Sequence, residues 1–442
     1  GILNAFEGCS GLKINYDKTE IFPIRYPASL WPTLMDVFPG NYSSLPGKYL
    51  GLPLHYRNVK RTDLQPLIEK INNRLAGWKG KLLSKAGRET LVKSVLSAQP
   101  IYHLTIFPPQ KWLLHSIDKM RRNFLWKGNN PEACSGGHCL INWPTTCLPK
   151  SKGGLGILDL DRFARGLRLR WLWLRWKSKD RAWTAMKLPC DKTDEDLFNA
   201  STMVTVGNGK IAEFWKSSWI HGQAPKSIAP SLFRKTKRKN ITVEKALTNN
   251  NWIRLCFPCS GEVELREFVS LWQAIGNMQE LNGLEDTITW KWSADGQYSA
   301  SSAYNIQFSS NYSTMNLCPI WKAMVEPRCR FFAWTLLHKR ILTADNLLKR
   351  GWPCNPLCCL CNSAPETILH LCKDCPFSRE VWNKVLSWAN LPFLNGILSD
   401  TSLYDWWTGL RSLCNRQSRR CFDGLLIHFW WNLWLERNNR IF

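Results

Sequence analysis

The sequence predicts an α+β fold that is mostly α-helical, with short strands near its N-terminus and a small metal-stapled helical domain near its C-terminus. Apolar residues recur at helical spacing over long stretches of the chain. Four Cys and His side chains also fall close together between residues 358 and 375, at the spacing of a closed zinc site. A chain of 442 residues can bury several cores, so we expect about two to four domains.

The composition points to a polyanionic partner. Lys and Arg number 59 against 34 Asp and Glu, which gives a net charge of +25. Globular chains this basic usually bind nucleic acid, RNA or DNA, although a basic and merely solvated surface is the alternative. The 17 cysteines without an N-terminal apolar segment predict a nuclear or cytoplasmic protein that is not secreted. No apolar run reaches transmembrane length, so we expect no membrane association; the oligomeric state stays open.

Residues 1–58 predict short strands. A turn at Gly11 precedes a strand at 12–15 and a second at 19–24, and residues 48–54 predict a short buried strand that bends at Gly51. The chain begins without Met, and we expect this segment to be the end of an α/β domain.

Residues 59–130 predict a bundle of helices. One helix begins at Thr62, a second begins at Ser84 and ends before Pro100, and a third lies near 112–126. Each has an apolar stripe; the stripes consist of Leu64, Leu67, Ile68, Ile71 and Leu75, of Leu91, Val92, Val95 and Leu96, and of Leu113, Ile117, Met120 and Phe124.

The opposite faces of these helices are basic and almost free of acids. We interpret them as a surface for a phosphate backbone, with a solvated face as the alternative. The basic side chains are Lys79, Lys81, Lys85, Arg88, Lys93, Lys119, Arg121, Arg122 and Lys127.

Residues 131–285 predict an irregular connecting region. It holds a glycine turn at 153–156 and a helix at 159–177 that buries Leu160, Phe163, Leu167, Trp171 and Leu174. We interpret the acidic run 191–196 as a solvated loop, 206–222 as a glycine hairpin, and 224–260 as a linker or irregular domain edge.

Residues 286–390 begin with a stretch, 286–308, that predicts a hairpin around Asp295 and Gly296 leading into a helix. Helices at 320–338 and 343–350 follow, and then the metal-binding segment. Residues 391–442 predict an aromatic helix at 425–442.

The metal-binding segment reads Cys-x2-Cys-x8-His-x4-Cys. We assign zinc to Cys358, Cys361, His370 and Cys375, as a structural ion, because four protein ligands leave no open position for water. Ser363 and Glu366 have the spacing of a capping box for a helix that carries His370. Three further thiols are alternative ligands or core residues: Cys354, Cys359 and Cys372.

Several motifs carry a resemblance to a known family. SGLKINYDKTE, KYLGLPL, RLAGWKGKLLSKAGRETLVKSVLSAQPIY and FLWKG resemble the C-terminal half of a plant non-LTR (LINE-type) retrotransposon reverse transcriptase. FFAWTLLHKRILTADNLLKRGW and CNSAPETILHLCKDCPFSREVW resemble the zinc-binding domain that follows that polymerase. The resemblance implies that residues 1–58 complete the palm and 59–130 form the thumb. It places Lys18 near the incoming nucleotide, and Tyr49, Leu50 and Gly51 in the hairpin that grips the primer end.

The chain holds no adjacent pair of aspartates, which polymerisation needs to bind two metal ions. We therefore assign no catalytic residue and predict a non-catalytic reverse-transcriptase fragment that binds template and primer through the thumb and the zinc site. Two alternatives remain: part of an RNA-directed DNA polymerase that is active only with a separate palm, and a structural protein-interaction module.

Overall fold

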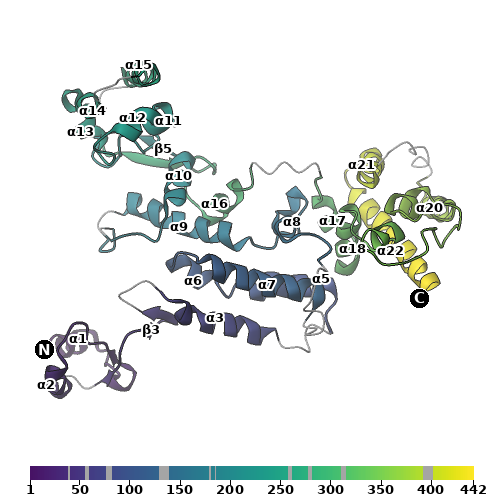
Figure 1. The fold of residues 1–442 in the computed structure, drawn as a ribbon, viewed down its shortest axis with the longest axis horizontal. Coiled ribbons are helices and arrows are strands. Elements are labelled where there is room, and N and C mark those ends of the chain that lie inside the picture. The colour runs from purple at the N-terminus through teal and green to yellow at the C-terminus, as the bar shows by residue number, and fades with distance from the viewer. Residues whose placement is uncertain are drawn as a thin grey trace. The chain divides into compact units, whose positions relative to one another are not determined.

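The computed structural model describes residues 1–37, 40–54, 59–75, 82–128, 139–178, 181–184, 186–256, 261–276, 281–309, 315–391 and 402–442. Within these ranges the chain is mostly helical and has three two-stranded sheets, which confirms the predicted fold class (Figure 1). It divides into two compact units, residues 1–74 and 75–442, which are described separately. In the described ranges, no helix combines the length and apolarity needed to cross a bilayer.

The first unit begins with helix α1 (Ile2–Ser10), which ends at Gly11 with a φ of 71°. The predicted strand at 12–15 is wrong: none of the strands in the described residues includes or pairs with this segment, and the amide of Ile14 donates to the carboxylate of Glu7 instead. The predicted strand at 19–24 shortens to β1 (Glu20–Ile21), because only these residues pair, in parallel, with β2 (Asn41–Tyr42). Helix α2 (Trp31–Val37) was not predicted.

Residues 47–54 form a tight hairpin. Strands β3 (Gly47–Tyr49) and β4 (Leu52–Leu54) pair antiparallel, and Leu50 and Gly51 make the turn with φ angles of 49° and 84°. The predicted single buried strand is therefore wrong, because two consecutive positive φ angles reverse the chain. Only Leu52 is buried in this segment. Helix α3 (Arg61–Arg74) follows and buries Leu64, Leu67 and Ile71, as its apolar stripe predicted.

The second unit opens with the remaining predicted helices. Ser84 caps α5 (Lys85–Leu91) by accepting from the amide of Gly87, and a π-helical turn (Val92–Leu96) continues it. Val92, Leu96, Ile117 and Phe124 are buried, as predicted, whereas Leu91, Val95 and Met120 are only half-buried. Two further helices complete this part: α6 (Ile101–Ile106), which was not predicted, and α7 (Lys111–Lys127).

Residues 160–306 surround an aromatic core. Ala229, Leu232, Val243 and Trp252 are buried in it, so the prediction of a linker at 224–260 is wrong for its described residues. The reason is that Pro225 and Pro230 begin short packed helices instead of interrupting the fold. Helix α8 (Trp143–Cys147) precedes this region. The helices described within it are α9 (Leu160–Lys177), α10 (Lys192–Ser201), α11 (Pro225–Ile228), α12 (Pro230–Lys235), α13 (Val243–Leu247), α14 (Asn251–Cys256), α15 (Glu262–Gly276) and α16 (Ala300–Ile306).

The acidic run 191–196 is not a solvated loop, as predicted, but the start of α10. Asp191 caps this helix, and Asp194 accepts hydrogen bonds from Nε and Nη2 of Arg168 at 2.7 and 2.8 Å. Asp194 and Arg168 are almost wholly buried. On α9, Leu169, Leu172 and Trp173 are buried beside Arg168. The predicted stripe is therefore only partly right: Leu160 is buried, while Phe163, Leu167, Trp171 and Leu174 are half-buried.

The strand that precedes the predicted turn at Gly296 pairs with a strand from much earlier in the chain, and not with the segment after the turn. Strand β6 (Thr287–Trp290) pairs antiparallel with β5 (Thr202–Thr205), which lies far earlier in the chain. The turn itself is present, because Gly296 has a φ of 66° and its carbonyl accepts from the amide of Trp290. Preceding β6, Asp286 accepts from four amides of the loop 207–212, which was predicted as a glycine hairpin.

The C-terminal part packs around helix α22. The predicted helix at 320–338 is split, because Pro327 begins a new helix after a short break. Phe332 contacts Trp431 and Trp434, with ring centroids 5.2 and 6.0 Å apart, and so joins two of these helices. The elements are α17 (Cys318–Lys322), α18 (Pro327–Leu337), α19 (Ala344–Leu348), a π-helical turn (His370–Asp374), α20 (Pro376–Trp388), α21 (Leu403–Leu413) and α22 (Arg419–Ile441).

Candidate metal centre

A tight loop brings Cys358 and Cys361 together. The amide of Asn362 donates to the carbonyl of Cys358 at 2.7 Å, and Asn362 itself has a φ of 54°. A bridge between Leu357 and Pro365 closes the loop at its base. Two sulfurs three residues apart therefore face the same point from a single turn.

The other two side chains come from the segment that follows. His370 begins the π-helical turn, and its amide donates to Oγ1 of Thr367 at 3.1 Å. Cys375 occupies the N-cap of α20, and its amide donates to the carbonyl of His370 at 2.8 Å. The backbone thus fixes the separation between these residues.

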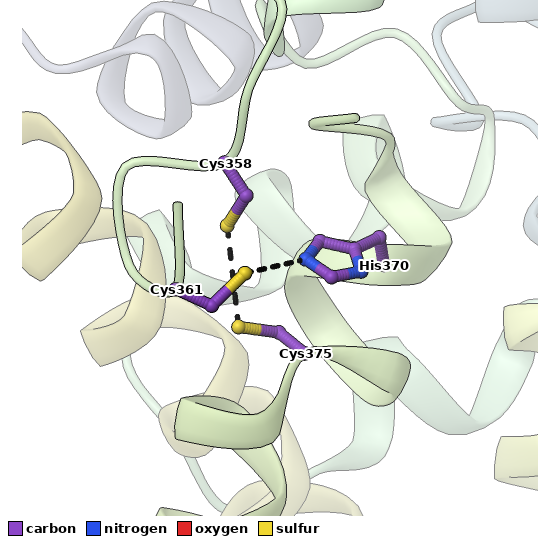
Figure 2. A group of neighbouring side chains, drawn as sticks. All are labelled: Cys358, Cys361, His370 and Cys375. Carbon is purple, nitrogen blue, oxygen red and sulfur yellow. Dashed lines mark hydrogen bonds between the residues drawn. The ribbon is translucent and has the colours of Figure 1, made fainter. Parts of the chain in front are cut away.

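The four predicted ligands converge on one point (Figure 2). Sγ of Cys358 lies 4.0 Å from Sγ of Cys375, and Sγ of Cys361 lies 3.3 Å from Nε2 of His370. All four ligand atoms lie within 4.8 Å of one another. A tetrahedral zinc ion with bonds of about 2.0–2.3 Å separates its ligands by about 3.3–3.8 Å. The donor set and its spacing therefore fit zinc after small adjustments.

The thiols differ in acidity before any ion binds. Burial raises the pKa of Cys358 to about 12. Burial acts in the same direction on Cys361, but hydrogen bonds from Ser363 and contacts with His370 outweigh it and lower the pKa of Cys361 to about 6. Since zinc binds thiolates, Cys361 offers the first charged ligand, and the ion has to displace the proton of Cys358.

The alternative thiols point elsewhere. Cys354 lies near the carbonyl of Ala344, at 3.6 Å, and Cys359 near that of Arg437, at 3.7 Å. Cys372 is buried, and burial raises the pKa of its thiol. None of them belongs to the four-residue group.

The predicted capping box is wrong. Ser363 donates to Sγ of Cys361 instead, and Glu366 is buried beneath the loop. One oxygen of Glu366 accepts from the amide of Ala344 at 2.8 Å and from Nη2 of Arg437 at 2.7 Å. Arg440 reaches the carbonyls of Cys359 and Leu360, both at 3.4 Å. Helix α22 therefore holds the back of the metal-binding loop.

Sequence reasoning missed these two arginines. The available signal was their spacing: Arg437 and Arg440 lie three apart on one face of the aromatic helix predicted at 425–442.

The predicted nucleic-acid contacts of the first unit are accessible. Lys18 is exposed at the end of a short 3₁₀ turn. Tyr49, Leu50 and Gly51 form the exposed tip of the β3–β4 hairpin, with Tyr49 63% and Leu50 71% exposed.

The predicted basic face in the second unit divides into several groups. Lys79 and Lys81 lie outside the described residues. Lys85 is exposed and Arg88 and Arg122 are half-buried. Lys93 bridges the carboxylate of Glu89 and the carbonyl of Leu155.

The prediction that Arg121 lies on this exposed face is wrong. Its side chain is fully buried, because it donates to Asp118 at 2.6 Å, to Oγ of Ser97 at 2.9 Å and to the carbonyl of Leu158 at 2.7 Å. The guanidinium of Arg121 therefore holds buried groups together and is not accessible to a phosphate.

Two comparisons with known proteins bear on this site. A family described as zinc-binding in reverse transcriptase matches residues 298–382, which include all four clustered side chains. A protein of Arabidopsis thaliana named "Putative ribonuclease H protein" is 25% identical over 438 residues. That similarity covers 88% of this chain and 66% of the Arabidopsis protein, so the chain spans just under two thirds of its length. Both similarities support a retroelement-related protein.

Proposed function

We propose that this chain is a nucleic-acid-binding, zinc-containing part of a non-LTR (LINE-type) reverse transcriptase that holds template and primer. The observation that carries the proposal is the Cys358, Cys361, His370 and Cys375 cluster within the matched zinc-binding segment. The chain has no adjacent aspartates to hold polymerisation metals, so the proposed role is binding and not nucleotide transfer. Under this proposal residues 1–58 complete the palm, 59–130 form the thumb, 131–285 connect, 286–390 bind zinc and 391–442 form the aromatic C-terminal segment.

The zinc ion in this proposal is structural. It would supply a cross-link between the Cys358–Cys361 loop, the π-helical turn and the start of α20, three short segments that follow one another in the chain. The protein residues define its surroundings: Ser363 orients Cys361, and the Glu366–Arg437 pair fixes the loop against α22.

Nucleic acid would be held mainly through its phosphates. The chain carries a net charge of +25, and Lys85 and Lys119 are exposed on neighbouring helices of the second unit, with Arg88 and Arg122 half-buried beside them. Such contacts depend on charge and not on base sequence. Lys18 and the Tyr49–Gly51 hairpin tip add exposed groups in the first unit.

The salt dependence of binding tests this proposal. We expect affinity for RNA and DNA duplexes to fall steeply with salt, with a log–log slope of about −0.9 per phosphate contacted. Replacing Lys85 and Arg88 by Ala should weaken binding alike across sequences and flatten the slope by about one per lost contact. Fluorescence anisotropy with labelled RNA and DNA over a salt series measures both quantities.

The matched control removes two positive charges elsewhere. Arg266 and Lys349 are 78% and 71% exposed and each pairs with an acid one turn away, so the Arg266→Ala/Lys349→Ala variant should bind like the parent. A flat salt dependence would contradict the proposal and favour a protein-interaction module. If the two double variants lose equal affinity for nucleic acid, the basic face contributes only through the overall charge of the protein.

A further inference from the structure

A second group of metal-ligating side chains lies between α18 and α22. Glu326 is the N-cap of α18, Cys329 is its third residue, and His428 belongs to α22. Nε2 of His428 lies 3.4 Å from Oε2 of Glu326, and Sγ of Cys329 lies 3.7 Å from the same oxygen. The three ligand atoms lie within 4.8 Å of one another.

The backbone holds this group in place. Met324 donates its amide to the carbonyl of Arg420 at 3.2 Å, and a Cβ at Gly424 would lie 2.6 Å from the carbonyl oxygen of Met324. Only glycine permits so close an approach, and His428 lies one helical turn beyond it. The start of α18 is therefore fixed beside His428.

The chemistry of the group suits an ion of the zinc class. A thiolate, an imidazole and a carboxylate are the three ligand types that zinc takes in proteins. Zinc bonds of about 2.0–2.3 Å place neighbouring ligands about 3.3–3.8 Å apart, and the two separations of 3.4 and 3.7 Å fall within that range. Cys329 is buried, whereas the side chains of Glu326 and His428 are 52% and 41% exposed, so an ion can enter from solvent.

We propose that Glu326, Cys329 and His428 bind a second zinc-class ion, with water as the fourth ligand, and that this ion fastens the start of α18 to α22. Binding forms a metal–sulfur bond and releases the thiol proton of Cys329 to solvent. Helix α22 is then anchored twice, at His428 by the ion and at Arg437 by Glu366, about 13 Å apart along its axis.

Metal counting on the full chain tests the proposal. After dialysis against buffered free zinc, the parent should retain two ions per chain, and Cys329→Ser or His428→Gln should retain one. The Cys361→Ser/Cys375→Ser variant should also lose one ion and keep the other, which separates the two sites. Cys421→Ser is the matched control, because this exposed thiol lies on the same helix outside the group.

Cobalt substitution gives a second readout. The thiolate-to-cobalt charge-transfer band should persist in Cys361→Ser/Cys375→Ser and disappear when Cys329→Ser is added. Because His428 is partly exposed, His428→Gln should fold normally, as circular dichroism can verify. One ion in the saturated parent, or an unchanged count in His428→Gln, would overturn the proposal and leave an ordinary surface ion pair beside a core cysteine.

Discussion

A single carboxylate, Asp286, organises the loop 207–212, which lies within the aromatic-core region. Its Oδ1 accepts from the amides of Gly207 and Gly209, both at 2.8 Å, and its Oδ2 from those of Ile211 and Ala212 at 2.9 and 3.0 Å. Burial alone would raise the pKa of Asp286, but these four hydrogen bonds outweigh it and lower the pKa below the ordinary value.

The sign of the pH effect follows from that lowered pKa. The stabilisation from Asp286 should be present above its unfolded pKa of about 3.9 and should be lost as pH falls through the lower folded value. Asp286→Asn turns one acceptor oxygen into a donor that faces two amides, so we expect a loss of about 2–4 kcal/mol at pH 7.

Urea unfolding of parent and Asp286→Asn from pH 7 to pH 3 measures the difference in free energy, which should shrink below about pH 4. Asp295→Asn is the control, because Asp295 is exposed and accepts locally from the amide of Gln297. A difference that stays constant down to pH 3 would contradict the role given to the carboxylate.

Arg121 and Arg122 are neighbours in sequence but have different roles. Arg121→Met leaves Ser97, Asp118 and the carbonyl of Leu158 without their donor, so it should lower the free energy of unfolding by about 2–4 kcal/mol. Arg122→Met should change it by less than about 0.5 kcal/mol. Thermal and urea unfolding compare the two, and equal losses would show that the buried contacts of Arg121 contribute little.

Among the elements, the metal-binding loop depends on a helix outside the matched segment. Glu366 is buried and its charge is balanced by Arg437 of α22, whose Nη2 lies 2.7 Å away. We expect Arg437→Ala to leave this carboxylate unpaired, to loosen the loop and to weaken zinc binding by about 10–100-fold, as loss of a supporting contact does elsewhere.

Competition with a chromophoric chelator measures that affinity. Arg440→Ala is the control, since Arg440 is partly exposed and its contacts to the loop are long. The Cys361→Ser/Cys375→Ser variant gives the zinc affinity that remains when two predicted ligands are removed. Unchanged zinc affinity in Arg437→Ala would show that α22 does not support the metal site.

Local features of these elements could be predicted from the sequence, and long-range ones could not. The helices predicted to begin at Ser84 and Asp159 do begin there, each capped by that side chain, and the four clustered ligands lie within 18 residues of chain, because nearby residues decide such contacts. The Asp194–Arg168 and Glu366–Arg437 pairs and the β5–β6 ladder join residues 26, 71 and 82 or more positions apart. In the sequence, Asp194 belongs to an acidic run, Glu366 is a single acid, and β5 and β6 are short strands; none of these patterns identifies a distant partner.

For the whole molecule, the proposed function predicts that the chain alone does not catalyse nucleotide transfer. With a primed RNA or DNA template and magnesium or manganese, the chain alone should incorporate no nucleotide above a protein-free control, because it lacks paired aspartates. The alternative role, part of a polymerase completed by a separate palm, predicts activity only when such a palm is added. Gel-based primer extension distinguishes these outcomes, and extension by the chain alone would contradict both.

The ladder between β5 and β6 also sets an order of events during synthesis. Thr205 pairs with Thr287, and Asp286 beside it secures the loop 207–212, so neither contact can form until residue 287 has left the ribosome. At about 5–20 residues per second, translation of the intervening stretch takes about 4–16 s. During that interval β5 has an unpaired edge and the surrounding aromatic side chains lack their final partners. This stretch of nascent chain is therefore where we expect chaperones to engage, and where slower translation would most increase aggregation.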